Sequence, residues 1–180
     1  MLKKRNKQYH GGNYQTPPSI QKRQKKMEKV DKSDRKIISI LSKDARMSLK
    51  EVSEMSGLSR SSVHQRIERM RRDSVLFGCG FMVNPKALGY GTCTYVGISL
   101  ERGSMYRSVV KKLEKIPEIV ECHFTTGPYT MLVKAYVKDN EQLMSLLNDT
   151  LQRIDGVMST ETLISLDQSI MRDVPITFED

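Results

Sequence analysis

Apolar residues in the N-terminal half of the chain recur every three or four positions, the period of an α-helix that buries one face. They form three groups: Ile37, Ile38, Ile40 and Leu41; Leu49, Val52 and Met55; and Val63, Ile67 and Met70. Asp31 and Asp34 are suited to cap the first of these segments. We therefore predict three helices within residues 31–72, of which the first supports the other two in a small core.

Polar residues at the ends of the second and third segments indicate a helix-turn-helix. Ser48 and Glu51 have the spacing of a capping box, so a helix should begin there. Gly57 can adopt the conformation that ends a helix, and Ser59 can then serve as the N-cap of the next helix. Two short helices joined by a glycine-containing turn are typical of proteins that place the second helix in the DNA major groove.

The outer face of the third helix favours DNA binding over an ordinary helical domain. If its apolar residues face inward, the helical period turns polar side chains outward. Short hydroxyl and amide groups suit base edges, and arginines suit phosphates. We predict base contacts from Ser61, Ser62 and Gln65, with His64 as an outside candidate; phosphate contacts from Arg60, Arg66, Arg69 and Arg72; and Ser59 as part of the same surface.

The periodicity changes in the C-terminal half. Val96, Ile98 and Leu100 alternate with residues of a second face, which predicts a strand. Similar alternation predicts strands at 120–124, 131–137 and about 157–166, and helices begin at Ser104 and Asp139. The order β-α-β-β-α-β is that of a ferredoxin-like domain, so the predicted fold class is α+β, with a winged or plain helix-turn-helix domain followed by a ferredoxin-like domain.

Composition and charge then divide the chain into four segments. These are a disordered basic tail (1–27), the helix-turn-helix domain (28–76), a glycine-rich extended linker (77–91) and the ferredoxin-like domain (92–180). The net charge is +9, and the tail alone holds eight Lys or Arg and no Asp or Glu. Such a tail would add nonspecific DNA affinity by counterion release. Alternatively it is dispensable, and Met27 is the true start.

Residue patterns give no case for an enzyme or a metalloprotein. The three histidines lack partners at ligand spacing, and the three cysteines form no Cys-x-x-Cys pair. A phosphate loop and a nucleophile elbow are absent from the sequence. It also has no apolar stretch of about 18 residues. We expect no catalytic residue, metal, cofactor or membrane association, and a location in the cytoplasm at the nucleoid.

The segment from about residue 29 to residue 175 resembles the Lrp/AsnC family of bacterial and archaeal transcription regulators, also called feast/famine regulators. The segments that carry the resemblance, in this order and at these spacings, are 30–38, 43–46, 57–59, 66–70, 83–85, 121–127 and 151–157. The resemblance implies a C-terminal domain for effector binding and oligomerisation. It also implies homodimers paired through their sheets, which assemble into octamers, and an amino-acid effector bound between dimers near the loop after the second strand.

The effector loop departs from the family pattern. That pattern is similar to Gly-Asp-Tyr/Phe-Asp, whereas this chain reads Gly127-Pro128-Tyr129-Thr130 and lacks both acidic residues. A carboxylate would pair with the α-ammonium of an amino acid, and a threonine can accept only a neutral bond, roughly half as strong. We expect the pocket wall at Thr126, Gly127, Tyr129 and Thr130, with Leu163 and Ser165 adjacent. We hypothesise a weak amino-acid response, a different ligand or no ligand, the loop then being a structural turn.

The sequence therefore predicts a sequence-specific transcription regulator that binds double-stranded DNA as an oligomer and is open to modulation by a small effector. An alternative from another class is a nucleoid-associated architectural protein with little sequence preference, which the basic tail and the lost acidic residues favour. A third is a metabolic sensor acting on an enzyme partner, against which the helix-turn-helix argues.

Overall fold

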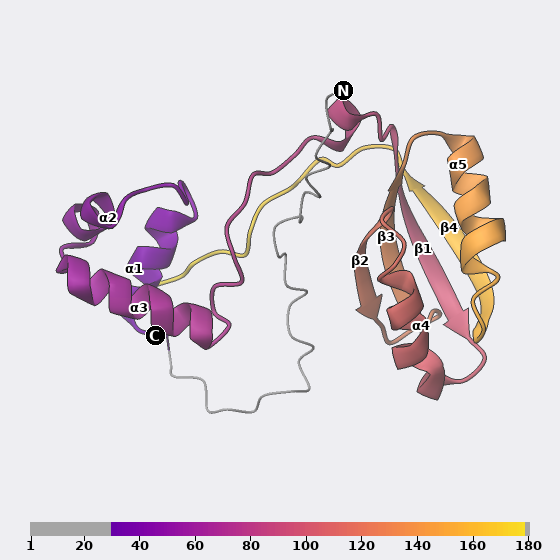
Figure 1. Cartoon of the computed structure of the whole chain (residues 1–180), viewed down its shortest axis with the longest axis horizontal. Coiled ribbons are helices and arrows are strands. Elements are labelled where there is room, and N and C mark those ends of the chain that lie inside the picture. The colour runs from indigo at the N-terminus through magenta and orange to yellow at the C-terminus, as the bar shows by residue number, and fades with distance from the viewer. Residues whose placement is uncertain (1–29, 179–180) are drawn as a thin grey trace, which may run out of the picture. The chain divides into compact units, whose positions relative to one another are not determined.

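A computed structural model describes residues 30–178, which divide into two compact units (Figure 1). The first contains residues 30–81 and 173–178, and the second is Met82–Arg172. The division falls inside the predicted linker, and residues 173–178, which the sequence assigns to the C-terminal domain, group with the first unit. The predictions about the basic tail and about Met27 lie outside the described residues.

The first unit contains three helices, as predicted: α1 (Lys32–Leu41), α2 (Leu49–Ser56) and α3 (Arg60–Arg72). Ser48 and Glu51 form the predicted capping box at the start of α2, and Gly57 ends that helix with a left-handed φ of 74°. The Ser59 hydroxyl accepts from the Ser62 N–H at 3.2 Å and caps α3. Residues 30–81 contain helices but no strands, so this helix-turn-helix is of the plain type, without a wing.

The core of the first unit comes from all three helices. Its buried side chains are Ile37, Ile40, Val52, Val63, Ile67 and Met70. Fully burying an aliphatic side chain stabilises a fold by about 1.5–3 kcal/mol, so this cluster holds α3 on α1 and α2. The predicted inward stripe of α2 was wrong in part, because Leu49 and Met55 are 41% and 53% exposed. They flank Val52 on this short helix, and Val52 and Ser56 face the core instead.

The second unit is an antiparallel sheet with two helices. Its elements are β1 (Thr92–Leu100), α4 (Tyr106–Leu113), β2 (Ile119–Phe124), β3 (Met131–Val137), α5 (Asn140–Ser145), a π-helical turn (Leu146–Leu151) and β4 (Val157–Ser165). The strand order is β2-β3-β1-β4, which confirms the predicted ferredoxin-like fold. Ser104 does not cap α4 as predicted, because a 3-10 turn (Gly103–Met105) comes first and the N-cap is Met105.

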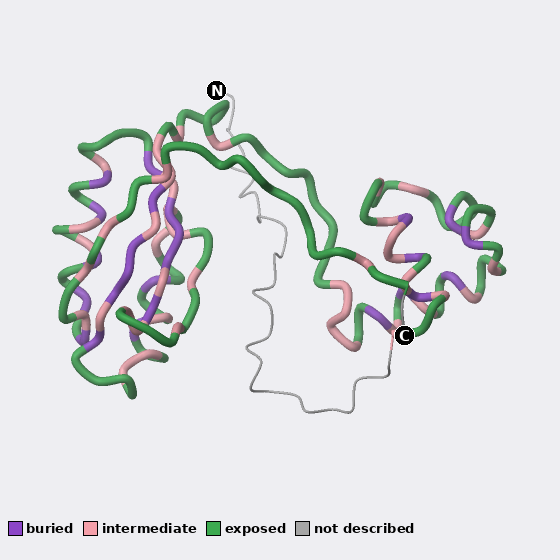
Figure 2. Tube along the Cα trace, turned by 180° about the vertical axis from the view of Figure 1, so that it is seen from behind, coloured by how far each residue is buried: buried purple, intermediate pink, exposed green. Residues whose placement is uncertain are grey.

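One face of the sheet packs against both helices and forms the second core. Val96 and Ile98 of β1 and Val109 of α4 are fully buried there, and Leu143 of α5 is 6% exposed. Figure 2 shows the buried residues of this sheet; in β1 and β3 burial alternates along much of the strand, but residues 96–98 and 133–135 are buried in succession. The opposite face, which we call the helix-free face, carries Tyr95, Gly97 and Ser99 from β1. Within the described helices none has the length and apolar composition to cross a membrane.

The segments that leave the two units are extended and exposed. Residues 77–84 have no regular structure and lead to a 3-10 turn (Pro85–Leu88) capped by the Asn84 side chain. Residues 166–178, which follow β4, contain no helix or strand. The Arg35 guanidinium of α1 donates to the Thr177 carbonyl at 2.5 Å and to its hydroxyl at 3.4 Å. This contact explains why residues 173–178 group with the first unit.

Candidate DNA-binding surface and effector loop

The packing of α3 determines which of its side chains face solvent. Val63, Ile67 and Met70 are buried against α1 and α2, which turns the opposite side of the helix outward. Of the predicted contact residues, those exposed to solvent are Ser59, Arg60, Ser61, His64, Gln65 and Arg72. We call this set of side chains the outer face of α3. The structure therefore brings six of the nine predicted DNA-contacting residues to one surface.

Serine hydroxyls are concentrated at the start of α3. Ser59 Oγ accepts from the Ser62 N–H as the helix cap, and it also lies 3.1 Å from Ser61 Oγ. Ser62 is half-buried, at the edge of the outer face. The N-terminal turn of a recognition helix is where base contacts concentrate, so hydroxyls fixed by a cap are well placed to meet base edges.

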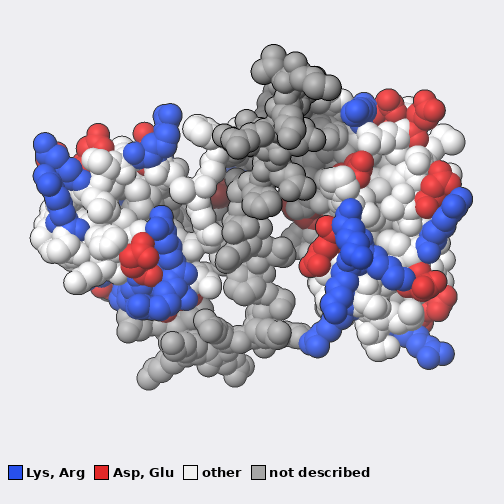
Figure 3. Space-filling view, in the orientation of Figure 1, with Lys and Arg blue, Asp and Glu red and all other residues white. Residues whose placement is uncertain are grey.

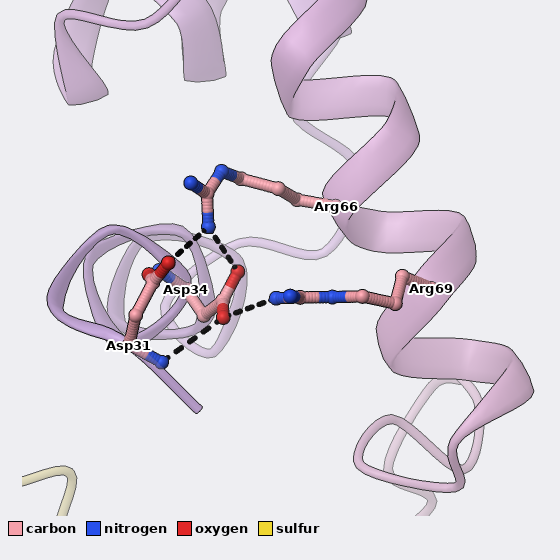
Figure 4. Close-up of polar contacts among 4 residues, drawn as sticks. All are labelled: Asp31, Asp34, Arg66 and Arg69. Carbon is pink, nitrogen blue, oxygen red and sulfur yellow. Dashed lines mark hydrogen bonds and ion pairs between the residues drawn. The ribbon is translucent and has the colours of Figure 1, made fainter. Parts of the chain in front are cut away.

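Arg66 and Arg69 have carboxylate partners inside the first unit (Figure 4). Arg66 Nη1 donates to Asp31 Oδ2 at 2.6 Å and to Asp34 Oδ1 at 2.8 Å. Arg69 Nη2 donates to the other oxygen of Asp34. Their side chains are only 26% and 23% exposed, and Asp34 is fully buried. The sequence predicted phosphate contacts for both arginines but gave no sign of these partners, which lie more than 30 residues away along the chain.

The charges of this cluster reinforce one another. Burial disfavours the charged form of Asp31, but the hydrogen bond from Arg66, the backbone N–H of Asp34 and the positive charge of Arg66 together outweigh this and lower the pKa of Asp31. Hydrogen bonds to Asp31 and Asp34 raise the pKa of Arg66. Both effects keep the ion pairs intact at neutral pH.

Two residues on the exposed side of α3 were missed by the sequence interpretation. Arg71 Nη1 lies 3.0 Å from Glu68 Oε1, and both side chains are more than half exposed. Glu68 follows Gln65 by three positions and His64 by four, so the helical period could have placed it beside the outer face. Figure 3 shows Lys and Arg side chains over the surface of the first unit, with acidic groups among them.

The effector loop is an ordered turn between β2 and β3. The Thr125 N–H donates to the Thr130 carbonyl at 3.1 Å, and the Thr125 hydroxyl donates to the Tyr129 carbonyl at 2.8 Å. Thr130 Oγ1 accepts from the Leu100 N–H at the end of β1, at 3.3 Å. The hydroxyl of Thr130, which stands where the family pattern has its second carboxylate, therefore bonds to the protein's own backbone.

Tyr129 lies over the helix-free face of the sheet. A Cβ added to Gly97 would come within 2.5 Å of the Tyr129 ring, so only glycine allows this close approach. Gly97 pairs with Glu161 of β4. Hydrogen bonding to Glu161 is the largest cause of a raised pKa at Tyr129. The register between β1 and β4 thus places the Glu161 carboxylate beside the effector loop. The sequence interpretation missed this residue because strand register has no local signal.

The six predicted effector residues are only partly gathered. Thr126, Gly127, Tyr129 and Thr130 share the loop, and Leu163 and Ser165 lie on β4 opposite Tyr95 and Cys93. Leu163 is two residues beyond Glu161 and Ser165 is four, which places them about 7 and 14 Å further along the strand. Leu163 is 55% exposed on the helix-free face and is available for contact.

A lysine is buried at the centre of the helix-free face. Lys134 of β3 is 8% exposed, and its ammonium lies 5.8 and 5.6 Å from the ring centroids of Tyr95 and Tyr136. Its Nζ pairs with Glu121 of β2 at 3.3 Å. Burial opposes the charge of Lys134, but the hydrogen bond and the negative charge of Glu121, with smaller contributions from Tyr136 and Tyr95, together outweigh it and raise the pKa of Lys134.

No group of three or more metal-ligating side chains occurs in residues 30–178. Cys79, Cys93 and Cys122 are free thiols, and burial raises the pKa of Cys122 to about 11. A thiol with so high a pKa is almost wholly protonated at neutral pH and is a poor nucleophile.

Two family models match the chain, and together they span both units. Residues 30–71 match the AsnC-type helix-turn-helix domain. Residues 93–175 match the Lrp/AsnC ligand binding domain.

Proteins and structures similar to this chain include several regulators. The regulatory protein AsnC of Haemophilus influenzae is 38% identical over 132 residues, which cover 73% of this chain and 88% of that protein. The HTH-type transcriptional regulator FL11 of Pyrococcus furiosus is 43% identical over 124 residues, 69% of this chain and 81% of that protein.

Among solved structures, that of AsnC from Escherichia coli has a TM-score of 0.76 and 35% identity, and the match covers 82% of this chain and 99% of that one. The feast or famine regulatory protein of M. tuberculosis, solved in complex with L-methionine, has a TM-score of 0.76 and 26% identity, with coverage of 83% and 100%.

Proposed function

Because this chain belongs to the Lrp/AsnC family of DNA-binding transcription regulators, we propose that α3 is its recognition helix and that its second unit binds a small effector. The outer face of α3 enters the major groove, with Ser61, Ser62 and Gln65 at base edges and His64 beside them. Arg60 and Arg72 contact phosphates, and Arg71 is added to that set. The observation that supports this most is the burial of Val63, Ile67 and Met70, which leaves α3 a single polar side to offer.

A footprint on DNA upstream of the protein's own gene tests this assignment. Gln65→Ala removes an amide that can bond two atoms of adenine, and we expect it to weaken protection of the site. Met55→Ala, which changes an exposed side chain on α2, is the matched control and should leave the footprint unchanged. An unaltered footprint for Gln65→Ala would remove Gln65 from the reading surface.

The second part of the proposal is a homodimer that assembles further into an octamer. The helix-free face offers Leu163, which is 55% exposed, beside the half-buried ring of Tyr95. Pairing two such faces would shield the Lys134–Glu121 ion pair and present two recognition helices to a palindromic site. Light scattering after size exclusion should give a mass of two or eight chains, and a monomer at micromolar concentration would contradict this.

The third part is that an amino acid, or a similar small molecule, is the effector. L-Methionine occupies the related structure from M. tuberculosis, and the same fold here carries the loop at Thr126, Gly127, Tyr129 and Thr130. Leu163 and Ser165 extend this wall along β4. Because the loop has no carboxylate, we expect weak binding of common amino acids, which calorimetry against each of them would measure; tight binding of leucine or alanine would contradict it.

We propose further that the protein acts by binding and not by catalysis, and that it works in the cytoplasm at the nucleoid. The runner-up, an architectural protein with little sequence preference, is the outcome if cognate and shuffled DNA bind equally.

A further inference from the structure

Four arginines of α3, those for which the sequence predicts phosphate contacts, fall into two groups that the sequence does not distinguish. Arg60 and Arg72 are exposed on the outer face. Arg66 and Arg69 turn toward α1 and donate to Asp31 and Asp34 (Figure 4). All four have the chemistry of a phosphate contact, but only the first two point to solvent.

Asp34 is the centre of the second group. Its carboxylate is fully buried and accepts from Arg66 at one oxygen, and from Arg69 and the Asp31 N–H at the other. Its own N–H donates to Asp31 Oδ1 at 2.8 Å, which completes the capping box of α1. A buried carboxylate must have such donors, because a buried charge without partners is strongly disfavoured. The two arginines are therefore required where they are.

We propose that Asp34 withdraws Arg66 and Arg69 from the DNA and so keeps the nonspecific affinity of α3 low. Phosphate contacts strengthen binding to any duplex, whereas base contacts distinguish one sequence from another. Two arginines that are ion-paired to α1 fix the position of α3 without raising its nonspecific affinity for DNA. Asp34 is thus a positioning residue for recognition. The inference rests on the proposed role of α3 as the recognition helix.

Four single variants of the full chain test the proposal through the salt dependence of binding to shuffled DNA. Each phosphate contact contributes about −0.9 to the slope of log K against log salt concentration. Arg60→Gln and Arg72→Gln are the matched controls and should each make the slope shallower by about 0.9 for every domain in contact with the duplex. Arg66→Gln and Arg69→Gln should leave it unchanged.

Asp34→Asn tests the same idea in the opposite direction. It removes the charge that holds both arginines while keeping the size of the side chain. We expect nonspecific affinity to rise about tenfold at roughly 0.1 M salt, the slope to steepen, and the ratio of cognate to shuffled affinity to fall. Adding Arg66→Gln and Arg69→Gln to Asp34→Asn should cancel the gain. A merely structural role of Asp34 would weaken binding to both DNAs without steepening the slope.

The outcomes separate this proposal from the function on which it rests. If the two control variants change the slope and Arg66→Gln or Arg69→Gln changes it equally, the arginines contact DNA and the proposal is overturned, even if Asp34→Asn fails to fold. If none of the four variants changes the slope, α3 does not face DNA, and both the proposed function and this inference fall. Unchanged slopes for Arg66→Gln and Arg69→Gln alone support the inference.

Discussion

The outer face of α3 and the loop between β2 and β3 are the two surfaces for which the sequence predicts binding, and residue type misleads differently in each. On α3, two arginines suited to phosphates reach Asp31 and Asp34 instead. In the loop, two expected carboxylates are missing, but Tyr129 lies over Gly97 beside Glu161 of another strand. A helix fixes the direction in which its short side chains point, but a long side chain can bend toward a neighbouring helix. A loop, by contrast, contacts strands that lie far away along the chain.

Replacing the central carboxylate of each region should give the largest difference between them. Asp34→Ala leaves two arginines without their buried acceptor, and we expect the first unit to lose about 2–4 kcal/mol of stability. Glu161→Ala removes an exposed carboxylate and should cost the second unit less than about 0.5 kcal/mol. Urea unfolding of each variant, monitored by far-UV circular dichroism, measures both losses of stability. Equal losses would mean that the two carboxylates play similar structural roles.

Filling the space above Gly97 should lower the stability of the second unit and leave the first unit unchanged. The side chain in Gly97→Val would collide with the Tyr129 ring, and forcing in the extra atoms should destabilise the second unit by about 1–3 kcal/mol. Gly97→Val combined with Tyr129→Ala makes room for the new side chain and should recover much of the loss. Thermal unfolding of the single and double variants gives the comparison, and a single variant as stable as the parent would show that the ring does not lie there.

An acidic residue placed in the loop between β2 and β3 should raise the affinity of that loop for amino acids. Thr130→Asp keeps an acceptor for the Leu100 N–H and adds a carboxylate for an α-ammonium group. Since a charge-assisted bond is roughly twice as strong as a neutral one, we expect amino-acid affinity to rise about tenfold. Calorimetry with a set of free amino acids measures this, with Thr162→Asp on β4 as the control. No gain in affinity would argue that the loop is a structural turn.

Acid should weaken the first unit slightly, in part through the half-exposed carboxylate of Asp31. The pKa of Asp31 is lowered in the folded protein, so this carboxylate stabilises the first unit above its ordinary pKa of 3.8. That contribution is lost as the pH falls through the lower folded value. Asp31 is half exposed, so solvent screening keeps the effect small. Urea unfolding at neutral and acidic pH should show a smaller pH dependence for Asp31→Asn than for the parent, and an unchanged one would contradict the ion pair.

The periodic parts of the molecule could be predicted from the sequence, and the contacts between distant segments could not. Local chemistry predicts the capping box of Ser48 and Glu51, the turn at Gly57 and the strand around Val96. The structure confirms all three. The Asp34 cluster joins residues more than 30 positions apart. The approach of Tyr129 to Gly97 likewise depends on strand register. Neither has a local signal, and the inward stripe assigned to Leu49 and Met55 failed because α2 turns Val52 and Ser56 to the core instead.

Fluorescence anisotropy on the full chain tests the central claim, that α3 reads DNA sequence, most directly. The parent and Gln65→Ala would be titrated with DNA from upstream of the protein's own gene and with shuffled DNA of equal length, across a salt series. We expect the parent to prefer the first by about a thousandfold. Gln65→Ala should lose about 1–3 kcal/mol of that preference while binding shuffled DNA unchanged. Equal affinity of the parent for both DNAs, falling steeply with salt, would contradict sequence recognition and favour an architectural role.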